Sequence, residues 1–208
     1  AVEAPQYPFP YKELDLDKVR EVAYAGYFDK AVGGCCYGVA VALLSQLQEV
    51  VGYPYTQIPA EMFANGKTGY GAGSLCGALG GAVGVLGLCL SAADSRAVTK
   101  ELFKWYTTTE LPIYQPEEPC DTHTVSPSVN CIDSVTTFKV AAGVEEDDPI
   151  RKRRCGGVTA DVAAKAAELL NVFYGYAEAA PVADAAPEET LADNEYIGEA
   201  ESEIGGTV

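Results

Sequence analysis

Apolar residues recur at helical spacing along most of the chain and predict a mostly helical protein. In five stretches, apolar side chains repeat every three or four residues or run almost unbroken. These stretches are residues 14–32, residues 35–51, the glycine-rich residues 75–93, a helix capped by Asp94 that passes Tyr106, and residues 157–179. A short helix is also expected after Pro59. The pattern predicts an all-α fold, a compact helical bundle with long irregular loops.

The segments outside these helices divide the chain into three parts. Residues 1–13 are rich in Pro and Tyr and are expected to form an extended arm. Residues 111–154 show no regular pattern, and loops that long inside a compact domain are usually functional or held down by contacts. Residues 178–208 form an acidic C-terminal tail that is expected to be disordered or to wrap a partner. Between arm and tail, residues 14–177 are expected to form one helical, cysteine-rich domain.

The chain is strongly acidic, which narrows the choice of partners. Of its 208 residues, 30 are Asp or Glu and 14 are Lys or Arg, giving a formal net charge of −16. Neither nucleic acid nor an anionic membrane surface is expected as a partner, because both bind basic surfaces. Residues 75–93 are long enough to cross a membrane, but they contain spaced glycines and lack aromatic or basic flanks. We therefore expect a buried core helix there and no membrane span.

Familiar catalytic and cofactor motifs are incomplete or absent. The sequence NGKT (65–68) ends like a phosphate-binding loop, but Glu61 replaces the earlier glycine that such a loop needs. His123 is the only histidine, and nothing around it indicates a catalytic triad. The chain has no Cys-x-x-Cys-His, so covalently bound haem is not expected. It has no Cys-x-x-Cys either, which disfavours a thioredoxin-type site.

The cysteines are the candidate chemical groups. There are seven, an odd number that cannot all pair internally: Cys35, Cys36, Cys76, Cys89, Cys120, Cys131 and Cys155. The pair at 35–36, Cys76 and Cys155 each stand at a predicted helix start, and Cys155 also follows four cations. Both features favour the thiolate over the thiol, and gathered thiolates suit a soft metal or an iron–sulfur cluster. Cys89 is expected to be a core residue. For the other six, a cluster, disulfides and free thiols all stay open.

Several motifs, in order along the chain, resemble a known family. They are GGCCYG (33–38), GYPYTQIP (52–59), LCGALGGA (75–82), LFKWYTTTELPIYQP (102–116), SPSVNCIDSV (126–135) and RKRRCGGVTADVAAKAAELLN (151–171). They resemble the family of redox-active proteins named for its C_GCAxxG_C_C pattern, in which CGALGG supplies Cys76, Gly77, Ala78 and Gly81. Within that family, about residues 14–175 are more similar to the cluster-bearing N-terminal domain of the split-Soret cytochromes c.

The resemblance implies an all-helical domain, usually exported, with a cysteine-bound iron–sulfur centre and a tendency to dimerise. It implies four iron ligands, which are Cys35, Cys76, Cys131 and Cys155. Cys36 and Cys120 match no family position and are candidates for substitute or additional ligands. The split-Soret relatives tend to show Cys-His where this chain has Cys131-Ile132, so the haem function of those relatives is not expected.

Two further features are expected to serve this cluster. Gly34, Gly73 and Gly77 would let backbone amides approach the cluster sulfides. The basic run that ends at Arg154 would offset the negative charge of the cluster and raise its reduction potential.

Three functions follow as hypotheses. The first is an iron–sulfur electron-transfer protein, more a carrier than a substrate-transforming enzyme, that serves a redox partner protein. Its place would be periplasmic or extracellular, because the chain opens Ala-Val-Glu-Ala-Pro, as after removal of an export signal. The second is a structural subunit of a homo-oligomer or filament, whose arm and tail wrap neighbouring copies and whose cysteines are structural. The third, a thiol–disulfide enzyme using Cys35 and Cys36, is disfavoured because adjacent cysteines close a strained ring.

Overall fold

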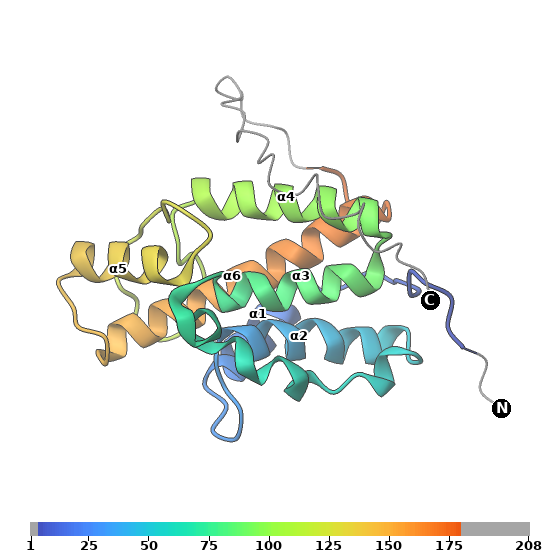
Figure 1. Ribbon diagram of the computed structural model, residues 1–208, viewed down its shortest axis with the longest axis horizontal. Helices are drawn as coiled ribbons and strands as arrows, with labels where there is room; N and C mark the ends of the chain where they lie inside the picture. The colour runs from blue at the N-terminus through green and yellow to red at the C-terminus, as the bar shows by residue number, and fades with distance from the viewer. Residues whose placement is uncertain (1–3, 180–208) are drawn as a thin grey trace, which may run out of the picture. The chain divides into compact units, whose positions relative to one another are not determined.

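The protein, seen in a computed structural model that describes residues 4–179, is a helical bundle (Figure 1). Its α-helices are α1 (Leu16–Tyr27), α2 (Cys35–Val50), α3 (Gly77–Cys89), α4 (Ala92–Thr108), α5 (Cys131–Ala142) and α6 (Pro149–Phe173). Short helical turns η1 (Tyr55–Gln57), η2 (Ala60–Gly66) and η3 (Gly69–Gly73) lead from α2 to α3. The described residues contain no strand, so the predicted all-α fold is confirmed. None of the helices in this part of the chain is long and apolar enough to cross a membrane.

α6 is the central helix of the bundle. It packs against α1, α2, α3 and α4, and small residues, mainly alanine and glycine, line much of its buried surface. α3 is buried over most of its surface, which is why its sequence is apolar throughout rather than amphipathic. α1 and α2 cross closely at Gly38, where a Cβ would lie 2.7 Å from the carbonyl oxygen of Ala23. The core therefore lies among α1, α2, α3 and α6.

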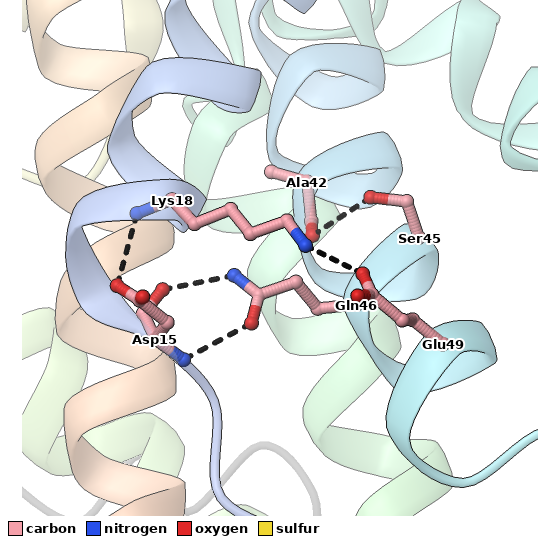
Figure 2. A network of polar contacts seen from close by, with 6 residues as sticks. All are labelled: Asp15, Lys18, Ala42, Ser45, Gln46 and Glu49. Carbon is pink, nitrogen blue, oxygen red and sulfur yellow. Dashed lines mark hydrogen bonds and ion pairs between the residues drawn. The ribbon is translucent and has the colours of Figure 1, made fainter.

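Buried Gln46 joins the start of α1 to the side of α2 (Figure 2). Its Nε2 donates to the carbonyl oxygen of Asp15 (2.8 Å), and its Oε1 accepts from the N–H of Asp15 (3.0 Å). The Asp15 side chain caps α1 by accepting from the backbone N–H groups of residues 17 and 18. Lys18 and Glu49 add an ion pair that is too exposed to contribute much. The buried amide thus fixes α1 on α2.

Residues 4–13 form no helix and lie along the bundle. The N–H of Phe9 donates to the carbonyl of Leu88 (2.9 Å), and the hydroxyl of Tyr11 donates to Oδ1 of Asn171 (2.7 Å). Asn171 also bonds the N–H and the carbonyl of Leu14. The arm is therefore packed against α3 and α6 of its own chain. Of the acidic tail, residues 180–208 lie outside the described residues.

α4 and α5 differ from the sequence-based expectation. α4 is capped by Ser91, whose Oγ accepts the N–H of Asp94 (3.1 Å), so Asp94 lies in the first turn and is not the cap. α5 lies inside residues 111–154, which were expected to be irregular. That expectation is wrong because α5 is a short helix with polar and β-branched positions, which weaken its propensity and its apolar repeat. It ends at Gly143, which has a φ of 67°.

α6 begins earlier than the apolar pattern indicates. Its first residue is Pro149, and the side chain of Asp148 caps it by accepting the N–H of Ile150 (2.7 Å). The basic run 151–154 therefore forms part of the first turns of α6 rather than a loop. As a consequence Cys155 lies inside the helix, and the expectation that it stands at a helix start is wrong.

The remaining long loop is anchored on α6 by a buried carboxylate. Asp161 accepts the N–H groups of Ile113 (2.7 Å) and Tyr114 (3.0 Å). Burial raises the pKa of Asp161 to about 6, although these two hydrogen bonds oppose the shift. The backbones of Leu111 and Thr124 also pair within the loop. The loop is thus held by contacts with the bundle, as the sequence led us to expect.

Candidate metal centre

Three helices start close together at one end of the bundle, and each start carries a cysteine. Cys35 is the first residue of α2, Cys76 is the N-cap of α3 and Cys131 is the first residue of α5. The N–H of Cys76 donates to the carbonyl of Val129 (2.8 Å), and the N–H of Cys131 donates to the carbonyl of Ser74 (2.7 Å). In Figure 1, α5 lies at the left, beside the starts of α3 and α6. The helix that the apolar pattern missed is therefore part of this site.

Cys155 reaches the same place from α6. A cavity of about 30 Å³, which we call the inner cavity, is lined by all four of these cysteines, together with Ser134 and Arg154. Cys35, Cys131 and Cys155 also line a larger, outer cavity of about 440 Å³. The four cysteines implied by the family resemblance thus gather in the fold, and three of them stand between the two cavities.

The helices that start at cysteines lack side-chain caps. The N-cap residues of α2, α3 and α5 make no side-chain hydrogen bond to the first turn. By contrast, side chains of Asp15, Ser91 and Asp148 cap α1, α4 and α6. Uncapped N–H groups and the positive end of the helix dipole both favour an anion. The arrangement at the cysteines therefore suits an anionic group.

Gly77 allows α3 to approach Cys35. A Cβ at Gly77 would lie 2.5 Å from the Sγ of Cys35 and 2.4 Å from the carbonyl oxygen of Gly66. Both distances are far shorter than a van der Waals contact, so only glycine fits without displacing the sulfur or the η2 backbone.

Gly77→Ala is expected to destabilise the protein by about 1–3 kcal/mol, because the added methyl group overpacks the contact with Cys35. Gly87→Ala is the matched control in the same helix, since a Cβ there meets nothing within 4 Å. We expect this control to stabilise the protein by up to about 1 kcal/mol through helix propensity. Urea denaturation followed by circular dichroism measures both changes. Equal effects of the two substitutions would contradict the close approach at Gly77.

The other glycines expected at the cluster lie in different surroundings. Gly34 borders the outer cavity and has a φ of 94°, which favours glycine. The side chain of Lys67 crosses it closely, with Cγ 3.2 Å from where a Cβ would be. Gly73 packs on the side chain of Ile132, next to Cys131 in sequence, and lines neither cavity.

The other cysteines do not line either of these cavities. Cys36 is buried, and its sulfur is hydrogen-bonded to Tyr70. Cys120 lies in the loop, where its sulfur accepts the N–H of Thr122 (3.4 Å). Cys89 is buried near the end of α3, as expected of a core residue. All seven cysteines fall within the described residues and are free thiols.

Burial and neighbouring sulfurs raise the pKa of Cys35, Cys36 and Cys131 in the metal-free chain. Burial, and then repulsion from the sulfurs of Cys76, Cys155 and Cys131, raises the pKa of Cys35 well above its usual range. The same causes raise the pKa of Cys131 to about 12, and burial raises that of Cys36. The expectation that a helix start makes Cys35 and Cys36 thiolates is therefore wrong without a metal. A metal ion would reverse this balance and release protons on binding.

Arg154 is a buried cation that opposes the rise in the pKa of Asp161 but forms no ion pair with that carboxylate. It is 3% exposed, its Nη2 donates to the Oγ of Ser134 (2.8 Å), and its Nη1 lies 3.9 Å from the Sγ of Cys155. Its guanidinium also lies over the ring of Phe138. Its Nε has no hydrogen-bond partner, and none of the ion pairs among residues 4–179 involves it. Such a cation is costly to bury, and an anion in the cavity beside it would offset that cost.

Comparison with known proteins identifies the family. The family described as "Putative redox-active protein (C_GCAxxG_C_C)" matches residues 35–169, a span that begins at Cys35 and includes Cys76, Cys131 and Cys155. The chain belongs to this family. The four cysteines that line the inner cavity thus all lie within the segment that defines a C_GCAxxG_C_C protein.

One relative has both a known sequence and a solved structure. The chain is 36% identical to split-Soret cytochrome c of Desulfovibrio desulfuricans over 169 residues, which cover 78% of this chain and 60% of the relative. It is also similar to the solved structure described as "A novel iron centre in the split-Soret cytochrome c from Desulfovibrio desulfuricans ATCC 27774". That match has a TM-score of 0.76 and 33% identity, and it covers 80% of this chain and 72% of the other.

Sequence reasoning missed two polar residues at the site of this C_GCAxxG_C_C protein. The hydroxyl of Tyr106, which is fully buried, donates to the Oγ of Ser134 (2.8 Å) and also bonds the sulfur of Cys76. Ser134 in turn accepts from Arg154. Both residues lie within the segment that matches the family, but only the fold shows that they link Arg154 to a cysteine.

The sulfur atoms that line the inner cavity suit a soft metal better than a hard cation. Four sulfurs, a buried guanidinium and uncapped helix starts offer thiolate ligands and positive surroundings, whereas Mg²⁺ and Ca²⁺ prefer oxygen ligands. Within residues 4–179, no three Cys, His, Asp or Glu side chains gather as a set that could hold one metal ion.

Proposed function

We propose that this protein is an electron carrier whose redox centre is an iron–sulfur cluster held by Cys35, Cys76, Cys131 and Cys155. The observation that supports it most is Arg154, a buried cation that forms no ion pair within residues 4–179 and lines the same cavity as the four cysteines. Iron bound by thiolates and sulfides carries a net negative charge, which would pair with the positive charge of Arg154. Membership in a redox-active family, and the iron centre described for the split-Soret cytochrome c, point the same way.

The residues of the chain have distinct tasks in this proposal. The four cysteines would bind the iron after losing their protons, and the uncapped starts of α2 and α3 would offer backbone N–H groups to the cluster sulfur. Arg154 and the positive helix ends stabilise the reduced, more negative state and so raise the potential. When bound, the cluster would accept and donate one electron at a time. Cys35, Cys131 and Cys155 also reach the outer cavity, so this is the side on which the electron would leave or enter the cluster.

Metal and sulfide analysis of protein purified without oxygen tests this proposal. We expect iron and acid-labile sulfide in stoichiometric amounts, and visible absorption that dithionite bleaches and air restores. A folded protein that contains neither iron nor sulfide would overturn the proposal, and one that contains zinc alone would indicate a structural metal instead. The export and the self-association expected from the sequence stay predictions.

A further inference from the structure

The outer cavity holds more positive charge than the proposed cluster accounts for. Its volume is about 440 Å³, which lies within the range of small-molecule sites. The cations that line it come from three separate segments: Lys30 from the α1–α2 loop, Lys67 from the turn after η2, and Arg151 and Lys152 from α6. Around a concave surface in a chain of net charge −16, four cations from distant segments form an unusual concentration.

Three of these cations pair with no carboxylate in the part of the chain that the structure describes. Lys30, Lys67 and Lys152 form no ion pair with any residue in the described range 4–179. The two acidic residues of the lining are already engaged: Glu146 pairs with Arg151 (3.3 Å), and Asp29 accepts the N–H groups of residues 31 and 32. The three lysines are thus available to an anion that enters the cavity.

The floor of the cavity also favours an anion. The uncapped start of α2, at Gly34 and Cys35, lies in its lining. The stem of Lys67 crosses Gly34, which holds this lysine at the positive end of the helix. Arg154 lines the inner cavity and not the outer one, so it offsets charge on the other side of the cysteines.

We propose that the outer cavity binds a small, multiply charged oxyanion against the sulfurs of Cys35, Cys131 and Cys155. A protein partner would need a broad contact face, whereas these cations converge on one concave site. That the bound oxyanion lies beside a redox centre rests on the proposed function, but the binding itself does not. Such an anion would be an effector that shifts the potential of the centre.

Calorimetric titration of the purified, metal-loaded protein with inorganic phosphate, and separately with malonate, tests this inference at low ionic strength. We expect one site for at least one of them, and the tighter of the two identifies a phosphate-type or a dicarboxylate ligand. Lys67→Glu and Lys152→Glu should each weaken binding by about 10- to 100-fold, the usual loss for a charge-assisted hydrogen bond. Lys100→Glu, an exposed lysine on α4 outside the cavity, makes the same charge change and should leave binding unchanged.

Two readouts on the same samples separate the two proposals. Saturating anion should lower the midpoint potential of the wild type, since a nearby negative charge favours the oxidised state, and should leave that of Lys67→Glu unshifted. Iron-containing protein that binds neither anion, or binds equally well in all three variants, overturns the inference and leaves the proposed function standing. Specific anion binding by protein that contains neither iron nor sulfide supports this inference and overturns the proposed function.

Discussion

Cys131→Ser is expected to lower the iron bound per chain by more than about tenfold, because second-sphere changes alone can cost that much and this change removes a ligand. Cys131 lines both cavities, and its backbone is fixed to Ser74 by a hydrogen bond of 2.7 Å. A serine hydroxyl at this position is a poor ligand for a soft metal. Iron analysis and visible absorption of the anaerobically purified variant measure the loss.

Cys120→Ser is the matched control for this prediction. Cys120 lies in the long loop and lines neither cavity. The iron content and the visible spectrum of the Cys120→Ser variant should therefore equal those of the wild type. Circular dichroism of both variants shows whether a loss of iron comes from a loss of fold. If Cys120→Ser loses iron while Cys131→Ser keeps it, the ligand set that we propose is wrong.

The helices that meet in the core could be predicted from the sequence because packing imposes a regular apolar repeat. α2 and α3 were expected at almost their true positions, and with them the placement of Cys35 and Cys76 at helix starts. α5 could not be predicted, since it packs on the bundle by only a few buried side chains, chiefly Ser134 and Phe138. The start of α6 at Pro149 could not be predicted from the apolar repeat, because the first turns of this helix are basic rather than apolar.

The gathering of the cysteines could not be derived from their spacing. Cys131 and Cys155 are far from Cys35 along the chain, and only the motifs shared with a family connected them before the fold was known. The pKa shifts of the thiols could not be predicted from the sequence either, because they depend on burial and on the distances between sulfurs in the fold. The helix start is a local feature that can be predicted from sequence, whereas the burial that raises the pKa of Cys35, Cys36 and Cys131 appears only in the fold.

Arg154→Met is expected to change stability differently with and without the bound metal. In the metal-free protein, Arg154 is a buried cation with an unpartnered Nε, so methionine should be close to neutral or stabilising. In the metal-loaded protein the substitution removes the partner of a buried anion and should cost about 3–5 kcal/mol. Urea denaturation of both forms, with iron content checked, measures the difference.

Arg153→Met is the control for this prediction, since Arg153 is the neighbouring residue and pairs at the surface with Glu118 (3.4 Å). It should change the stability of either form by no more than about 1 kcal/mol. The midpoint potential gives a second readout that does not depend on a folded metal-free form: it should fall in Arg154→Met and stay unchanged in Arg153→Met. An equal loss of stability in both forms of Arg154→Met, with an unchanged potential, would mean that Arg154 only supports the packing around Ser134 and Phe138. The buried arginine would then no longer point to an anion, and the main support for a cluster at the four cysteines would be lost.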